Sequence, residues 1–258
     1  MMRLVALWLF LASSAFAAAP ALDGSVASYG ASGSSYNVTL TTTAAGTIVV
    51  MVAANSGTVS SISDTAGRTY AKRSGATSGG GNGIEMWYAN SASAVTSDVI
   101  TVTLSGFSGF TTIHAFGVSN TYTGSSPWDA NAALPDISVG AAPRDPRSAT
   151  TSNASNFIIG AFRMASTSNP TAGSGYTMIF GSSGSGWALT EYKVVAATQS
   201  GLSVTVGTGS NTSNGGIADA LMEAGGGGAA PKNQLMLRGL TSLPANDNEL
   251  PRLAAVAE

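Results

Sequence analysis

His114 is the only histidine of the chain, and so the only imidazole that could act as a general base near neutral pH. A serine nucleophile needs such a base beside its hydroxyl, oriented in turn by a carboxylate. In the segment FTTIHAF, His114 lies on the same strand face as Phe110 and Phe116. The nucleophile-elbow spacing G-x-S-x-G does not occur in the chain. This pattern favours a strand histidine, packed or on the surface, and we predict no catalytic residue.

Two glutamates in strand-like segments offer a second kind of chemistry. Glycosidases place a pair of carboxyl groups beside the scissile bond, and Glu85 in IEMWYA and Glu191 in LTEYKV could form such a pair if one groove held both. Aromatic residues, which usually line the grooves of jelly-roll glycosidases, make up only 7% of the chain. Lys193 follows Glu191 on the same strand face and predicts a charge contact for that acid. A glycan-cleaving enzyme is therefore the least favoured function.

Acidic residues also gather in the long loop 120–150, where Asp129, Asp136 and Asp145 could approach a calcium ion. Their spacing does not match the D-x-[DN]-x-[DN]-G calcium loop. The chain has no cysteine for a zinc or iron–sulfur site, and neither G-x-G-x-x-G nor a phosphate loop occurs. We therefore predict no metal and no cofactor, and calcium binding by this loop stays open.

The aromatic residues of the chain favour a glycan-binding function over an enzymatic one. Sugar recognition needs exposed flat rings for stacking and short polar side chains for the hydroxyl groups. Trp128 lies in the loop segment YTGSSPWDA, where an exposed ring points to function. The alternative is that these rings belong to the core, as most sandwich tryptophans do. The candidate platform consists of Trp87, Tyr122, Trp128 and Trp187.

A cluster of charges in SISDTAGRTYAKRS, residues 61–74, could mark a site or a turn. Asp64 can bond the backbone of the turn, and Gly67 can supply a positive φ. Arg68, Lys72 and Arg73 would then keep a two-stranded ribbon soluble and protect its edges. We interpret the segment as a β-hairpin, with a ligand role for Asp64 as the alternative.

Composition and strand spacing predict the fold class. Only 9% of the residues are charged and 32 are glycines, which suits strands joined by tight turns. The segments TIVVMV and FIIGAF carry apolar residues on both faces, so we expect them to be central strands covered on both sides. The chain is predicted to be all-β, an antiparallel two-sheet β-sandwich of jelly-roll or Ig-like type with about a dozen short strands and flexible termini. Strand signals occur at residues 36–41, 47–54, 59–63, 69–73, 84–89, 98–104, 111–119, 157–165, 176–180, 187–195, 202–207 and 216–223.

The chain ends suggest an exported protein with one folded domain. Arg3, an apolar stretch and Ala15-Phe16-Ala17 form the pattern of a signal peptide cleaved near Ala17, with no membrane span in the mature chain. A net charge of −2 without a basic block argues against nucleic-acid binding. The predicted organisation is a signal peptide at 1–17, a flexible lead-in at 18–35, a β-sandwich domain at 36–224, a Gly-rich linker at 225–234 and a C-terminal tail or docking segment at 235–258.

The segments AAGTIVVMVAA (44–54), VSSISDTAGRTYAKRS (59–74), IEMWYANSAS (84–93), DVITVTLSG (98–106) and SSPWDANAA (125–133) carry a resemblance, as do IHAFGVSN (113–120), TSNASNFIIGAF (151–162) and GIADALMEAG (216–225). Over residues 35–225 the chain resembles a β-sandwich module found in uncharacterised exported bacterial proteins and in phage virion or tail-associated proteins. The resemblance implies a fold and no activity or site residues.

The first functional prediction is a non-catalytic, secreted structural or adhesion protein that acts by surface display or attachment in a cell-surface assembly, with a virion assembly as the alternative location. Low charge would let like subunits pack, so a homo-oligomer is expected. The alternative function is a carbohydrate-binding module, whose partner would be a surface glycan.

Overall fold

The computed structural model describes residues 18–30, 32–78, 81–124, 126–143, 145–164, 170–182, 188–207 and 213–225. They belong to one compact unit, Met1–Gly227, and a second unit, Gly228–Glu258, lies outside the described residues. The predicted signal peptide, the tail at 235–258 and Trp187 also lie outside them. Among the described residues there is no helix long and apolar enough to cross a membrane.

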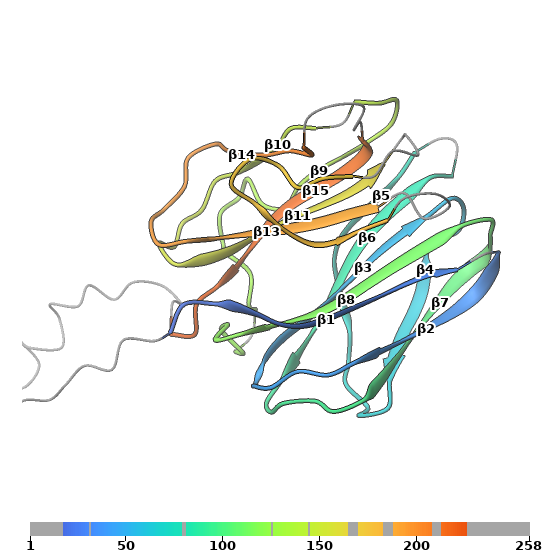
Figure 1. Cartoon of the computed structure of the whole chain (residues 1–258), viewed down its shortest axis with the longest axis horizontal. Coiled ribbons are helices and arrows are strands. Elements are labelled where there is room, and N and C mark those ends of the chain that lie inside the picture. Colours follow the sequence, from blue (N-terminus) through green and yellow to red (C-terminus); the bar gives the residue numbers. More distant parts are fainter. Residues whose placement is uncertain are drawn as a thin grey trace, which may run out of the picture. The chain divides into compact units, whose positions relative to one another are not determined.

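The described strands form four antiparallel sheets (Figure 1). Sheet I contains, in order, β2 (Gly33–Leu40), β7 (Asp98–Ser108) and β4 (Val59–Asp64). Sheet II contains β1 (Ala21–Gly30), β8 (Thr111–Ser119), β3 (Gly46–Ala54), β6 (Gly83–Ser91) and β5 (Ala71–Thr77). Sheet III contains β12 (Thr177–Gly181), β13 (Ala188–Val195), β11 (Asn156–Met164), β15 (Ser213–Met222) and β9 (Asp136–Val139). Sheet IV pairs β10 (Arg147–Ala149) with β14 (Leu202–Val204).

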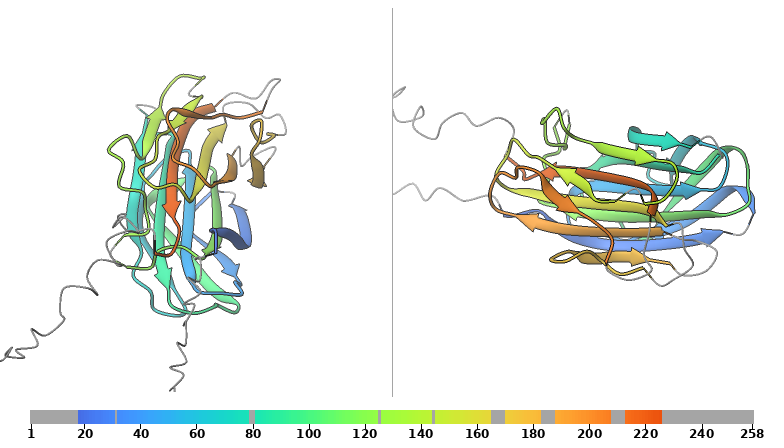
Figure 2. Two further views of the ribbon diagram at one scale, coloured as in Figure 1. Left: turned by 90° about the vertical axis from the view of Figure 1, so that its left-hand side faces the viewer. Right: turned by 90° about the horizontal axis from the view of Figure 1, so that it is seen from above.

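Apolar side chains fill the spaces between successive sheets, which lie face to face (Figure 2). A first core lies between sheets I and II, a second between sheets II and III, and a third between sheets III and IV. Sheets II and III are therefore covered on both faces. The cores include Val50 and Ile100 in the first, Met51 and Phe157 in the second, and Ile158 and Val204 in the third.

The all-β antiparallel class is confirmed, with fifteen described strands in four sheets where the sequence predicted about a dozen in two. The two segments predicted to be central, now β3 and β11, are buried at every position. Their alternate residues enter different cores, because successive side chains of a strand point to opposite faces. Ile48 of β3 contributes to the first core and Val49 to the second.

The flexible lead-in expected at 18–35 is wrong for residues 21–30, which form strand β1, and for residues 33–35, which begin β2. Strand β1 pairs with β8 along its length, and its register shifts between Leu22 and Ser25. The strand carries few large apolar residues, of which Leu22 and Val26 pack only partly against the second and first cores, and a buried carboxylate, that of Asp23, helps to hold it. That carboxylate accepts hydrogen bonds from the backbone N–H groups of Thr43 at 2.8 Å and Ala44 at 2.9 Å.

The predicted hairpin at residues 61–74 is also wrong. Strand β4 belongs to sheet I and β5 to sheet II, so the chain crosses between sheets at the turn. Gly67 has the expected positive φ of 73°. Arg68 lies inside the crossing, where its Nη1 is 2.8 Å from carboxylate oxygens of both Asp64 and Asp98. These ion pairs therefore stabilise the segment in which the chain crosses from sheet I to sheet II.

Candidate functional site

One end of the described unit combines exposed aromatic rings with a cluster of amide side chains. We call it the ring-and-amide end and define it by Phe107, Phe110, Arg163 and the three asparagines Asn55, Asn82 and Asn214. Antiparallel pairing brings these residues together, because β3 ends where β6 and β8 begin, with Ala54 opposite both Gly83 and Thr111. In sheet III, β11 ends where β15 begins, with Arg163 opposite Gly215. In Figure 1 this is the end where β7 turns into β8.

Arg163 is the centre of the amide cluster. Its Nη1 donates to Oδ1 of Asn214 at 2.7 Å, and its Nη2 donates to Oδ1 of Asn82 at 2.9 Å and to Oδ1 of Asn55. Asn55 follows β3 and Asn82 precedes β6, so the guanidinium reaches from sheet III to sheet II. Side chains from three separate chain segments are thus oriented by one buried arginine, which is 6% exposed.

The charge of Arg163 is not neutralised within the described chain. The other described arginines, Arg68, Arg73 and Arg147, each have a carboxylate oxygen within 3.2 Å. No ion pair of Arg163 occurs among the described residues, and burial lowers the pKa of its guanidinium. An arginine nevertheless stays protonated in proteins, so this end of the unit carries a positive charge that no described carboxylate pairs with.

Two phenylalanines lie where β7 leads into β8, Phe107 near the end of β7 and Phe110 in the short connection between the strands. Phe107 is 68% exposed and Phe110 is 42% exposed. Their backbone is tied to the amide cluster, because the N–H of Asn55 donates to the carbonyl of Phe110 and Oγ of Ser56 donates to the carbonyl of Phe107, both at 2.9 Å. Displayed rings therefore lie beside oriented amides on a rigid support.

The predicted ring platform is not a single surface. Trp128, expected to be exposed in its loop, is 2% exposed and belongs to the second core. Its ring lies under the guanidinium of Arg73, 5.1 Å from the centroid, and edge-on to Tyr88 at 5.4 Å. Trp87 packs partly against the first core, on the other side of sheet II. Tyr122 is half-buried, and Trp187 lies outside the described residues.

The two glutamates of the predicted pair also face different cores. Glu85 lies on the side of sheet II that faces the first core, where its Oε2 accepts from Nε1 of Trp87 at 2.9 Å and pairs with Nζ of Lys72 at 3.0 Å. Glu191 shares a strand face with Leu189 and Val195 of the third core. Sheets II and III separate the two carboxyl groups, so they do not share a groove.

Glu191 is fully buried, on the side of sheet III that faces the third core. Burial raises its pKa to about 7, partly offset by a hydrogen bond from the N–H of Gly173 at 2.7 Å. Its Oε1 has no hydrogen-bond partner in the part of the chain that the structure describes. The ammonium of Lys193, expected near this acid, instead lies 5.7 Å from the centroid of the Tyr176 ring.

His114 packs between sheets II and III. Its Nδ1 shares a hydrogen bond with Oγ1 of Thr190, and the ring of Phe180 meets it edge-on at 4.2 Å. The ring is completely buried, and burial lowers its pKa to about 3. Its hydroxyl partner belongs to a threonine of the opposite sheet, and this contact fastens β8 to β13.

The acids of the loop 120–150 each hold a piece of backbone or a neighbouring side chain. Asp129 accepts hydrogen bonds from the N–H groups of Asn131, Ser152 and Asn153, and together these bonds lower its pKa despite its burial. Asp136 pairs with Arg147, and Asp145 accepts from Thr205 and Ser213. In the described part of the chain, no three His, Asp or Glu side chains gather closely enough to hold a metal ion.

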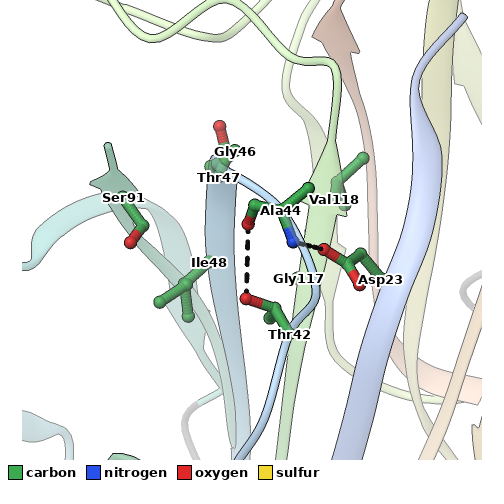
Figure 3. Close-up of a pocket in the computed structure, with 9 residues that line it drawn as sticks. All are labelled: Asp23, Thr42, Ala44, Gly46, Thr47, Ile48, Ser91, Gly117 and Val118. Atoms are coloured by element: carbon green, nitrogen blue, oxygen red, sulfur yellow. Dashed lines mark hydrogen bonds between the residues drawn. The ribbon is translucent and has the colours of Figure 1, made fainter. Parts of the chain in front are cut away.

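A small cavity lies beside Asp23, and Figure 3 shows its lining. Its volume is about 10 Å³, which is room for about one water molecule. Oγ1 of Thr42 donates to the carbonyl of Ala44 next to it. The cavity belongs to the joint between β1 and the start of β3 and is too small for a ligand. It is lined by Asp23, Thr42, Ala44, Gly46, Thr47, Ile48, Ser91, Gly117 and Val118.

Comparison with protein-family models, with characterised proteins and with solved structures found no match for this chain. The functional interpretation therefore depends on the geometry of the ring-and-amide end.

Sequence reasoning missed this end because no local pattern joins its parts. Phe107 and Phe110 stand in the turn SGFSGF, where large aromatic residues are unusual and could have been noticed. Arg163 is the one charged residue in the apolar strand FIIGAFRM, which is a second signal. Asn55 follows β3, Asn82 precedes β6 and Asn214 lies at the start of β15, and only the strand register shows that they meet.

Proposed function

We propose that the protein is a non-catalytic, exported attachment module of a cell-surface or virion assembly, with the ring-and-amide end as its contact face. The observation that carries the proposal is the exposure of Phe107 and Phe110 where β7 leads into β8, with their carbonyl groups hydrogen-bonded by Asn55 and Ser56. Binding residues are commonly found on loops positioned by a rigid scaffold. Here the scaffold is a stack of four sheets with three apolar cores.

The positions of the described chain ends support this orientation. Nδ2 of Asn120 donates to the carbonyl of Ala19 at 3.1 Å, and the N–H of Ala224 donates to the carbonyl of Asn120 at 2.7 Å. Asn120 follows β8, whereas Phe110 precedes it. A strand of that length separates the two ends by about 30 Å. The chain can thus be tethered at one end while the rings contact a target at the other.

A carbohydrate ligand is the form of attachment that the residue types favour. Exposed rings can stack on sugar faces, and carboxamides can bond hydroxyl groups. This keeps the carbohydrate-binding function predicted from the sequence but moves it from Trp128 to Phe107 and Phe110.

The test is retention of the labelled mature chain, residues 18–258, on cell envelopes and on a panel of immobilised polysaccharides. Phe107→Ser and Phe110→Ser should each reduce retention, and the double variant should abolish it, with an unchanged melting temperature because both rings are exposed. Val194→Thr is the control, since Val194 is an exposed apolar residue at the far end of β13. Full retention of the double variant would overturn the proposed contact face. Light scattering on the same samples tests whether the module is an oligomer.

A further inference from the structure

We propose that the ring-and-amide end binds an acidic saccharide, whose carboxylate is received at Arg163 and its three asparagines. This inference rests on the attachment function proposed above and names the ligand class of the same face.

The first argument is the unbalanced charge. Desolvating a cation without a counter-charge is costly, and the other described arginines avoid this by pairing with acids. Arg163 is surrounded by neutral amide oxygens from Asn55, Asn82 and Asn214 instead. The carboxylate of Asp145 on the sheet III side is engaged by Thr205 and Ser213. An incoming anion would supply the charge that the described chain does not.

The second argument is the orientation of the amides. A guanidinium only donates hydrogen bonds, so each asparagine must turn its Oδ1 toward Arg163 and its NH₂ group away. None of the three Nδ2 atoms donates a hydrogen bond within the described residues, and none is buried without a partner. Among the residues that the structure describes, the cluster therefore offers N–H donors and a positive charge without a competing carboxylate. Such a set suits a carboxylate better than a neutral hydroxyl, which needs acceptors as well as donors.

The third argument is the neighbouring rings. The Asn55 side chain accepts from Arg163, while its backbone N–H bonds the carbonyl of Phe110. One residue thus links the charged cluster to an exposed ring. A polymer of acidic sugars has both features within one residue, a flat sugar face for the ring and a carboxylate for the cluster.

The experiment compares two polymers with one backbone. Binding of the mature chain to polygalacturonate and to its methyl ester is measured by affinity electrophoresis and calorimetry, because the ester keeps the sugar backbone and replaces each carboxylate with a neutral methyl ester. We expect binding to polygalacturonate, with a dissociation constant weaker by about tenfold or more for the ester.

Asn82→Asp is the decisive variant. It places a carboxylate against Arg163, which neutralises the cation inside the protein and should leave the fold intact, as judged by thermal unfolding. We expect it to lose binding to polygalacturonate, and Asn214→Asp repeats the test from sheet III. Gln199→Glu adds the same charge at the opposite end of the unit and should keep the binding.

Equal binding of both polymers, with Asn82→Asp unaffected, would overturn the acidic ligand and leave attachment to neutral glycans standing. Loss of binding in Gln199→Glu as well would show only bulk charge repulsion and would also overturn the site. Absence of binding to polygalacturonate by the wild-type chain would overturn the inference outright. The attachment function is judged separately, by the retention of the phenylalanine variants.

Discussion

The guanidinium of Arg73 on β5 donates two hydrogen bonds, of 2.7 and 3.1 Å, to the carboxylate of Asp219 on β15. This contact joins sheet II to sheet III. Asp219 is fully buried, and Arg73 also covers the ring of Trp128. The contact closes one side of the second core, while the contact between His114 and Thr190 closes the other.

Removing Arg73 should therefore destabilise the whole stack. Arg73→Ala leaves the Asp219 carboxylate buried without its partner, and we expect a loss of about 3–5 kcal/mol in the free energy of unfolding. Urea denaturation measures this loss. Lys72→Ala is the matched neighbour, because Lys72 is more exposed and its partner Glu85 keeps hydrogen bonds from Val59 and Trp87. That variant should lose about 1 kcal/mol or less. Equal losses in the two variants would contradict the assigned role of Arg73.

The buried acid Glu191 predicts that the stability of the folded protein decreases as the pH rises toward neutral. Its pKa is raised by burial to about 7, so the folded protein keeps a proton that the unfolded chain releases above its ordinary pKa of 4.5. The stability contributed by this protonated acid is complete below pH 4.5 and is lost as the pH rises through about 7. Glu191→Gln should therefore stabilise the protein at pH 8 relative to wild type, with a smaller difference at pH 5. Thermal unfolding at the two pH values gives the comparison, and a variant that is less stable at pH 8 would contradict it.

Burial of His114 should have the opposite effect on the pH dependence of stability, because it lowers stability as the pH falls. Burial holds its pKa near 3 in the folded state, against 6.5 in the unfolded chain. Between these values only the unfolded chain binds the proton, so stability falls by up to about 1.4 kcal/mol per pH unit as the pH drops below 6.5. The imidazole resonances of the folded protein should not titrate between pH 7.5 and 4.5 in NMR spectra. A midpoint near 6.5 would mean that the ring is exposed.

The strand pattern was largely predictable, and strand partners were not. The alternation in β7 and the continuous apolar character of β3 and β11 follow from which faces are buried. Strand β1 was missed because its few apolar residues, Leu22 and Val26, form no strand pattern in the sequence, and pairing with β8 is not visible there. The crossing after Asp64 was mistaken for a hairpin, because the partners of β4 and β5 are distant in sequence.

The candidate site was harder to predict for a related physical reason. Trp128 stands among turn-forming residues, yet its ring is buried beneath Arg73, a contact between residues 55 positions apart. Arg163 and its three asparagines come from four chain segments, and their meeting depends on the register of both central sheets.

Hydrogen exchange followed by mass spectrometry tests the proposed contact face most directly. The mature chain is compared alone and bound to the envelope or polysaccharide that retains it. We predict slower exchange in the peptides that cover residues 55–58 and 105–111, and unchanged exchange around Trp87 and at the far turn near Asn120. Protection confined to those other regions, with none at the turn that carries Phe107 and Phe110, would contradict the account.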